Sequence, residues 1–149
     1  MTTLTRTNSD DQNFVELVHH LDADLAEKNG DQNPFYAQFN KIAKIKHVVI
    51  AHENGKAIAC GAIKEYEQGI MEVKRMYTAP ESRGKGIAGQ ILAELESWAA
   101  ELGYQKCILE TGLKQVAAIR LYEKSGYSRI PNYGQYAGIE NSVCFEKRL

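Results

Sequence analysis

The stretch from 69 to 103 constrains the fold more than any other part of the chain, because a strand, a loop and a helix follow one another there. GIMEVKRMYTAP alternates apolar and polar residues up to Pro80, as a half-buried strand does. GQILAELESWAAELG then has helical apolar spacing and ends at Gly103. Between the two, SRGKGIAG places three glycines and two cations at the start of the helix. The stretch therefore predicts a strand–loop–helix unit of an α/β sheet.

Further elements are predicted on both sides of this unit. The apolar patterns indicate strands at 3–7, 47–53, 56–66, 106–111 and 142–149, and helices from Asp10 or Asp11 to about 30, at 33–43 and at 114–126. Asn54-Gly55 is a hairpin turn sequence between two of the strands. We therefore expect an α/β fold with helices on both faces of a mixed sheet, and one domain over 1–149.

The overall charge and the cysteines exclude several classes of protein. A net charge of −1 with 25% charged residues is not that of a nucleic-acid binder. The sequence has no apolar run long enough to span a membrane and no signal-peptide pattern at its start, which predicts a cytoplasmic protein. Cys60, Cys107 and Cys144 lie far apart and among strand residues, so we expect reduced core cysteines and no metal site, with a nucleophilic Cys107 as the alternative.

The glycine-rich loop has the composition of an anion-binding site. Gly84 and Gly86 permit positive φ and close approach of a ligand to the backbone, while Arg83 and Lys85 add charge beside a helix N-terminus. An ordinary turn with solvated cations is the structural alternative. The loop lacks the hydroxyl residue of a P-loop and the spacing of a dinucleotide-binding loop. A phosphate group is therefore the expected ligand, without ATPase or redox chemistry.

Two separated motifs then indicate a family. Arg83, Gly86 and Ala88 match Q/R-x-x-G-x-G/A, and MYTAPESRGKGIAGQIL followed by AAIRLYEKSGY resembles the GCN5-related N-acetyltransferase (GNAT) family over about 45–130. The resemblance implies a bent sheet of about six or seven strands with about four helices, splayed between the strands that end at Thr78 and Thr111. Acetyl-CoA would lie in that gap with its pyrophosphate on the loop.

The resemblance also implies a set of cofactor-binding residues. They are Met76, Tyr77, Thr78, Arg83, Gly84, Lys85, Gly86, Ile87, Ala88, Gln115 and Tyr122. Gln115 stands where the family often has asparagine.

Acetyl transfer to an amine needs a hydrogen-bond donor, an acid and a base. The Met76 N–H is our candidate donor to the thioester oxygen, and the Tyr122 phenol is the candidate acid for the leaving thiolate. Strand alternation predicts that Glu72, Lys74 and Met76 share one face, which favours Glu72 as the base; Glu110 competes for that role.

The acceptor is the least constrained part of the prediction. Phe35, Tyr36, Tyr133 and Tyr136 lie in turn-rich segments suited to a pocket wall, and they are also compatible with core packing or a homodimer contact. Arg75, predicted to face away from Glu72, and Glu110 are further candidates for substrate binding. We expect an acetyl-CoA-dependent enzyme acting on a primary amine of a small molecule, amino-acid-like or polyamine. The alternative is a non-catalytic acyl-CoA-binding module for regulation or protein interaction.

Overall fold

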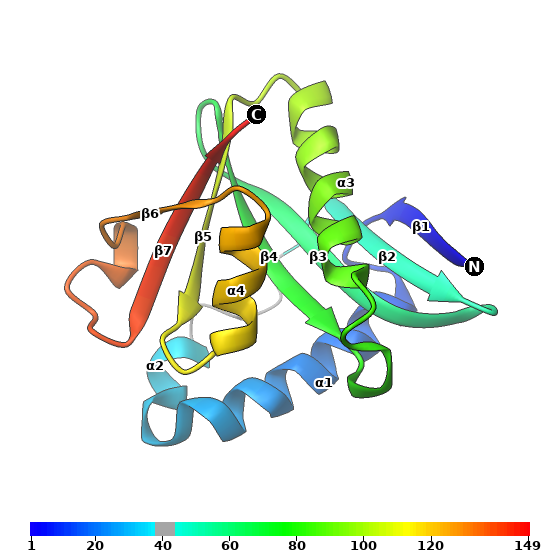
Figure 1. Cartoon of the computed structure of the whole chain (residues 1–149), viewed down its shortest axis with the longest axis horizontal. Coiled ribbons are helices and arrows are strands. Elements are labelled where there is room, and N and C mark those ends of the chain that lie inside the picture. The colour runs from blue at the N-terminus through cyan, green and yellow to red at the C-terminus, as the bar shows by residue number, and fades with distance from the viewer. Residues whose placement is uncertain (38–43) are drawn as a thin grey trace.

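Seven strands form one mixed sheet in the order β1-β2-β3-β4-β5-β7-β6 (Figure 1). This computed structural model describes residues 1–37 and 44–149. The strands are β1 (Thr2–Thr7), β2 (His47–Glu53), β3 (Lys56–Glu67), β4 (Ile70–Thr78), β5 (Lys106–Gly112), β6 (Ser128–Ile130) and β7 (Ser142–Arg148). The helices are α1 (Gln12–Asn29), α2 (Asn33–Ala37), α3 (Ile87–Glu101) and α4 (Val116–Lys124). The α/β fold that the sequence predicted is confirmed.

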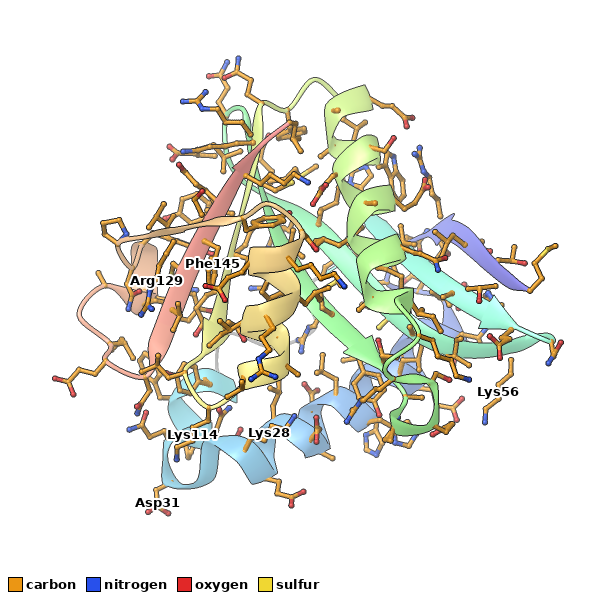
Figure 2. The ribbon with its side chains drawn as sticks, in the orientation of Figure 1. Lys28, Asp31, Lys56, Lys114, Arg129 and Phe145 are labelled. Atoms are coloured by element: carbon orange, nitrogen blue, oxygen red, sulfur yellow. The ribbon has the colours of Figure 1, made fainter. Side chains whose placement is uncertain are left out.

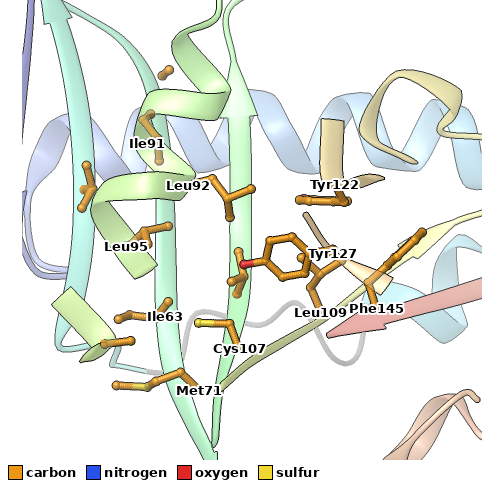
Figure 3. Close-up of a cluster of buried hydrophobic side chains, with 14 of the residues drawn as sticks. Ile63, Met71, Ile91, Leu92, Leu95, Cys107, Leu109, Tyr122, Tyr127 and Phe145 are labelled. Carbon is orange, nitrogen blue, oxygen red and sulfur yellow. The ribbon is translucent and has the colours of Figure 1, made fainter. Parts of the chain in front are cut away.

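Helices cover both faces of the sheet, and each face has its own apolar core. On one face, α3 and α4 pack over β3, β4 and β5 through buried residues such as Ile91, Leu95 and Leu109 (Figure 3). On the other face, α1 packs over β2 and β3 through residues such as Phe14 and Val18. Burial of these helix stripes fixes both layers on the sheet. No helix in the described part of the chain has the length and apolarity needed to cross a membrane.

Two local predictions are confirmed. Asn54 and Gly55 both have positive φ, 52° and 79°, and they join β2 to β3 in a tight turn. The three cysteines are free and buried. Burial raises the pKa of the Cys107 thiol to about 12, so the thiol stays protonated at neutral pH and is a poor nucleophile.

Among the differences between the predicted elements and the structure, three stand out. β6 was not predicted, because its three residues at the sheet edge are too few to show alternation. α3 begins at Ile87, two residues before the predicted start, since Gly86 takes the cap position. Of the helix predicted at 33–43, α2 covers Asn33–Ala37, and 38–43 lie outside the described residues.

β4 and β5 separate partway along their length, as the resemblance implied. The two strands are parallel and pair at Ile70, Met71 and Glu72 of β4, with no further pairs among the described residues. Beyond Glu72 the strands diverge, which opens the sheet between them (Figure 1).

A β-bulge in β4 reverses the side-chain alternation just where the strands part. Lys74 pairs with Ala62 and Tyr77 with Cys60, so Arg75 and Met76 together oppose Gly61. Arg75 has a φ of 61°, which is uncommon for a residue with a side chain.

The bulge makes the predicted faces of Met76 and Arg75 wrong. Met76 packs in the core beneath α3, on the side of Val73, and away from Glu72. Arg75 reaches Asp22 of α1, so it lies on the α1 side of the sheet. The extra residue shifts the period by one, which sequence alternation could not register.

Candidate functional site

A cleft of about 650 Å³ occupies the gap between β4 and β5. Its walls come from the end of β4, the loop that leads into α3, the end of β5 and the start of α4, and α1 and α2 close one side. On β4 the predicted residues Glu72, Arg75, Met76, Tyr77 and Thr78 all line it. The separation of two sheet strands therefore forms a concave site of the size of a ligand pocket.

The glycine-rich loop presents backbone donors to this cleft. Gly84 and Gly86 each have a φ of 79°, and Gly86 is the N-cap residue of α3. The first N–H groups of a helix have no partner within it, and the helix dipole makes this end positive. The predicted loop residues Arg83, Gly84, Gly86, Ile87 and Ala88 line the cleft, and Lys85 is exposed beside it. The geometry fits a phosphate group.

Arg83 is held at the end of β4 by contacts that the sequence did not predict. Its Nε donates to the Thr78 carbonyl at 2.8 Å, and its guanidinium lies 5.7 Å from the centre of the Tyr77 ring. Its Nη2 is 3.8 Å from Asp24 of α1. Arg83 thus joins the loop to α1 at the mouth of the cleft.

Tyr122 lies at the inner wall of the cleft, as predicted from its helical face. Its ring is 6% exposed and packs against Tyr127 and Phe145, with ring centres 5.9 and 6.2 Å away (Figure 3). Burial, with the nearby Glu110 carboxylate, raises the pKa of the Tyr122 phenol above its ordinary value of 10. The phenol therefore carries its proton at neutral pH. Gln115 lines the cleft from the N-cap position of α4.

Glu72 is held by two neighbours on the α1 side of the sheet. The Tyr133 hydroxyl donates to Glu72 Oε2 at 2.6 Å, and Lys74 Nζ is 3.7 Å from Glu72 Oε1. Burial and the Glu72 charge raise the pKa of the Tyr133 phenol, so this hydroxyl remains a donor. Tyr133 itself reaches Glu72 from the β6–β7 loop without lining the cleft.

Glu110 has the environment of a proton acceptor that works at neutral pH. Its Oε2 is buried and has no hydrogen-bond partner among the described residues. Burial, aided by the Glu72 charge and opposed by Ser142 and Lys74, raises the pKa of Glu110 to about 7. A carboxylate that ionises near pH 7 suits general base catalysis.

The aromatic residues predicted to bind substrate divide into two groups. Tyr36 and Tyr136 line the cleft, and the Tyr36 hydroxyl shares a hydrogen bond of 3.0 Å with Ser142. Phe35 lines a second, smaller hollow beside the β6–β7 loop. Tyr36 and Tyr136 therefore lie, like Tyr122, near Glu110 in the cleft.

Arg75 is tied to α1. Its side chain is 3% exposed, and its Nη1 is 3.0 Å from Asp22 Oδ1. A guanidinium so placed joins α1 to the bulge in β4.

Three cleft-lining lysines were not among the predicted site residues. Lys74 lies on β4, while Lys28 of α1 and Lys114 of the β5–α4 turn lie toward the same end of the molecule (Figure 2). The strand alternation that puts Lys74 on the face of Glu72 could have identified Lys74 as a site residue. No pattern in the neighbouring sequence indicates that Lys28 and Lys114 lie at the cleft. No three His, Cys, Asp or Glu side chains in the described ranges gather closely enough to hold a metal ion.

Comparison with known proteins gives consistent matches. Residues 14–127 match the profile described as Acetyltransferase (GNAT) family. A protein named IAA acetyltransferase from Azospirillum brasilense is 31% identical over 99% of this chain and 97% of its own length. The crystal structure of a Klebsiella pneumoniae protein assigned as an acyl-CoA N-acyltransferase has a TM-score of 0.84, with 32% identity over 100% of this chain and 98% of that one. The crystal structure of a GNAT family acetyltransferase from Elizabethkingia anophelis with acetyl-CoA bound has a TM-score of 0.70 at 16% identity. That match covers 99% of this chain and 98% of the other.

Proposed function

Because the chain belongs to the GNAT acetyltransferase family, and is thus an acetyl-CoA-dependent N-acetyltransferase, we propose that it acetylates a primary amine of a small molecule, amino-acid-like or polyamine. The amine attacks the thioester directly. The observation that carries this proposal is that Glu110, Tyr122 and the glycine-rich loop line one cleft. We take Glu110 as the base, Tyr122 as the acid and the loop as the phosphate site. A cytoplasmic location and a homodimer remain predictions from the sequence.

The loop and α4 would hold acetyl-CoA, which supplies the acetyl group as an activated thioester. The pyrophosphate would bind the N–H groups of Gly84, Gly86 and the first turn of α3, whose residues line the cleft. Arg83 adds a full positive charge there if it exchanges Asp24 for phosphate.

The bulge in β4 gives a reason to place the oxyanion donor at Met76. Arg75 and Met76 have no paired residue on β3, and β4 has no pair on β5 at this level among the described residues. We propose that the Met76 N–H at this irregularity donates to the oxygen on which negative charge develops.

We assign the base to Glu110 and not to Glu72, which the sequence favoured. Glu72 already accepts a hydrogen bond from the Tyr133 hydroxyl. Glu110 has a buried oxygen without a partner in the described part of the chain, and its pKa is about 7. An amine loses its proton to Glu110 as its nitrogen bonds to the acetyl carbon. The carbon–sulfur bond breaks, and the thiolate takes the proton of Tyr122.

Thiol release from acetyl-CoA with a panel of amines tests this function. We expect at least one small primary amine to raise release above hydrolysis, and Tyr122→Phe to reduce the rate. No acceleration by any amine would refute catalysis and favour the non-catalytic module left open by the sequence.

A control separates loss of chemistry from loss of binding. Tyr122→Phe should reduce kcat far more than it reduces CoA affinity in calorimetry, because the loop supplies the phosphate contacts. A loss of rate no larger than the loss of CoA affinity would contradict the role of Tyr122 as an acid.

A further inference from the structure

Lys74 and Glu110 stand at the same level on the two sides of the split sheet. In the parallel register, Ile70 pairs with Lys106 and Glu72 with Ile108. Two residues farther along each strand are Lys74 and Glu110. Both side chains line the cleft, one from each edge.

They also lie on the same face of the sheet. Val73 and Leu109, which precede them, both point into the core beneath α3, so the next residue on each strand points to the α1 side. The pairing of Lys74 with Glu72 agrees with this. A molecule that lies across the gap on the α1 side can therefore contact an ammonium on one edge and a carboxylate on the other.

The charge of the cleft argues against a polycation there. Of the described residues that line it, five are cationic and three are carboxylates. Lys74 lies on the α1 side of β4, beside Glu72, whereas α3, whose N-terminus follows the loop, packs on the other face. A second ammonium on an acceptor would lie beside Lys74 and be repelled.

We propose that the acceptor is a small molecule with a carboxylate beside its primary amine, and that Lys74 binds this carboxylate while Glu110 faces the amine. Lys74 is then a specificity-determining residue, and the acceptor is amino-acid-like. This inference rests on the function proposed above.

The test compares acceptors that differ in the carboxylate alone. The kcat/KM for acetyl transfer is measured with the proteinogenic L-amino acids, their α-amides, and the polyamines putrescine and spermidine. We expect the kcat/KM of the preferred amino acid to exceed that of its amide by about tenfold or more, which is the effect of one charge-assisted hydrogen bond. The α-amine of an amide resembles a chain terminus, with a pKa of about 7.7–8.0, and loses its proton more readily, so amine basicity cannot produce that preference.

Variants assign the preference to Lys74. Lys74→Met should bring the ratio of acid to amide close to one, and Lys74→Arg should retain much of it because the charge remains. Lys124→Met is the matched control, since Lys124 is exposed on α4 outside the cleft, and it should leave the ratio unchanged. A ratio that survives in Lys74→Met would overturn the assignment.

A measurement on the unaltered protein covers the case in which Lys74→Met does not fold. The deaminated carboxylate of the preferred amino acid should inhibit competitively against that amino acid, and its amide should not. Preference for an amide or a polyamine by the unaltered protein would overturn this inference alone, since acetyl transfer to an amine would still occur. Absence of transfer to every amine would refute the proposed function and this inference with it.

Discussion

Replacing Glu110 by glutamine should make the protein less active and more stable at pH 8. Glu110 is half-buried at the cleft wall, and its Oε2 is buried with no partner among the described residues. Folding therefore disfavours its charge, and the amide of glutamine carries none. If Glu110 is the base, the same substitution removes the proton acceptor and lowers kcat by about 10²- to 10⁴-fold.

The size and sign of the stability change follow from the pKa. The pKa of Glu110 is about 7 in the folded protein, against an ordinary value of 4.5. Below pH 4.5 the group is protonated in both states, and no penalty exists. Between pH 4.5 and 7 the unfolded chain releases the proton while the folded protein keeps it, so the free energy of unfolding falls as the pH rises. Above pH 7 the full penalty is present, about 3 kcal/mol.

Urea unfolding at several pH values from 4 to 8 measures this penalty. Glu110→Gln should match the unaltered protein near pH 4 and exceed its free energy of unfolding by about 3 kcal/mol at pH 8. The kcat/KM of the unaltered enzyme should fall below pH 7 as Glu110 becomes protonated.

Glu123→Gln is the control, because Glu123 is exposed on α4, and it should change neither profile. A Glu110→Gln variant that is less stable at every pH, or that keeps full activity, would refute the assignment of a strained buried base.

Three further substitutions test other parts of the site. Tyr122→Phe should lower kcat by about 10²-fold at pH 8, measured by steady-state thiol release, and an unchanged kcat would contradict its role as acid. Gly86→Val forces a side chain to a φ of 79°, so it should raise the Kd for CoA in calorimetry at least about tenfold and cost about 1–2 kcal/mol of folding free energy. Gly55→Val, with the same φ in the β2–β3 turn, is the control and should leave the Kd unchanged. Gly61→Ala places a Cβ against the Met76 sulfur, so it should cost about 1–3 kcal/mol in thermal unfolding and lower kcat by displacing the bulge; a fully active, equally stable variant would contradict that packing.

Local patterns in the sequence predicted most of the fold. Asn54-Gly55 specifies its own turn, and the alternation of β4 and the apolar stripe of α3 each depend on residues close together in the chain. The glycine-rich loop could be found for the same reason, because its position between a strand and a helix already implies exposed N–H groups at a helix start. Three-residue β6 lacks enough residues to carry such a pattern.

The bulge at Arg75 marks where local reasoning failed. Arg75 has a positive φ, and an arginine gives no sign of this in the sequence. The extra residue of the bulge moves Met76 to the face opposite Glu72. Neighbours in the folded protein stabilise the bulge: the Cys60 thiol donates to the Arg75 carbonyl at 3.4 Å, and Asp22 of α1 binds the guanidinium.

The amino-acid sequence alone was enough to predict the order of most strands and helices, the glycine-rich loop and the motifs of the family, since each is encoded in residues near one another. Only the tertiary structure gave a reason to prefer Glu110 over Glu72 as the candidate base. A carboxylate's pKa depends on burial and on nearby charges, and here Tyr133, Ser142 and Lys74 come to the two glutamates from different parts of the chain. Lys74 and Glu110 likewise face each other across the cleft only because β4 and β5 first pair and then diverge.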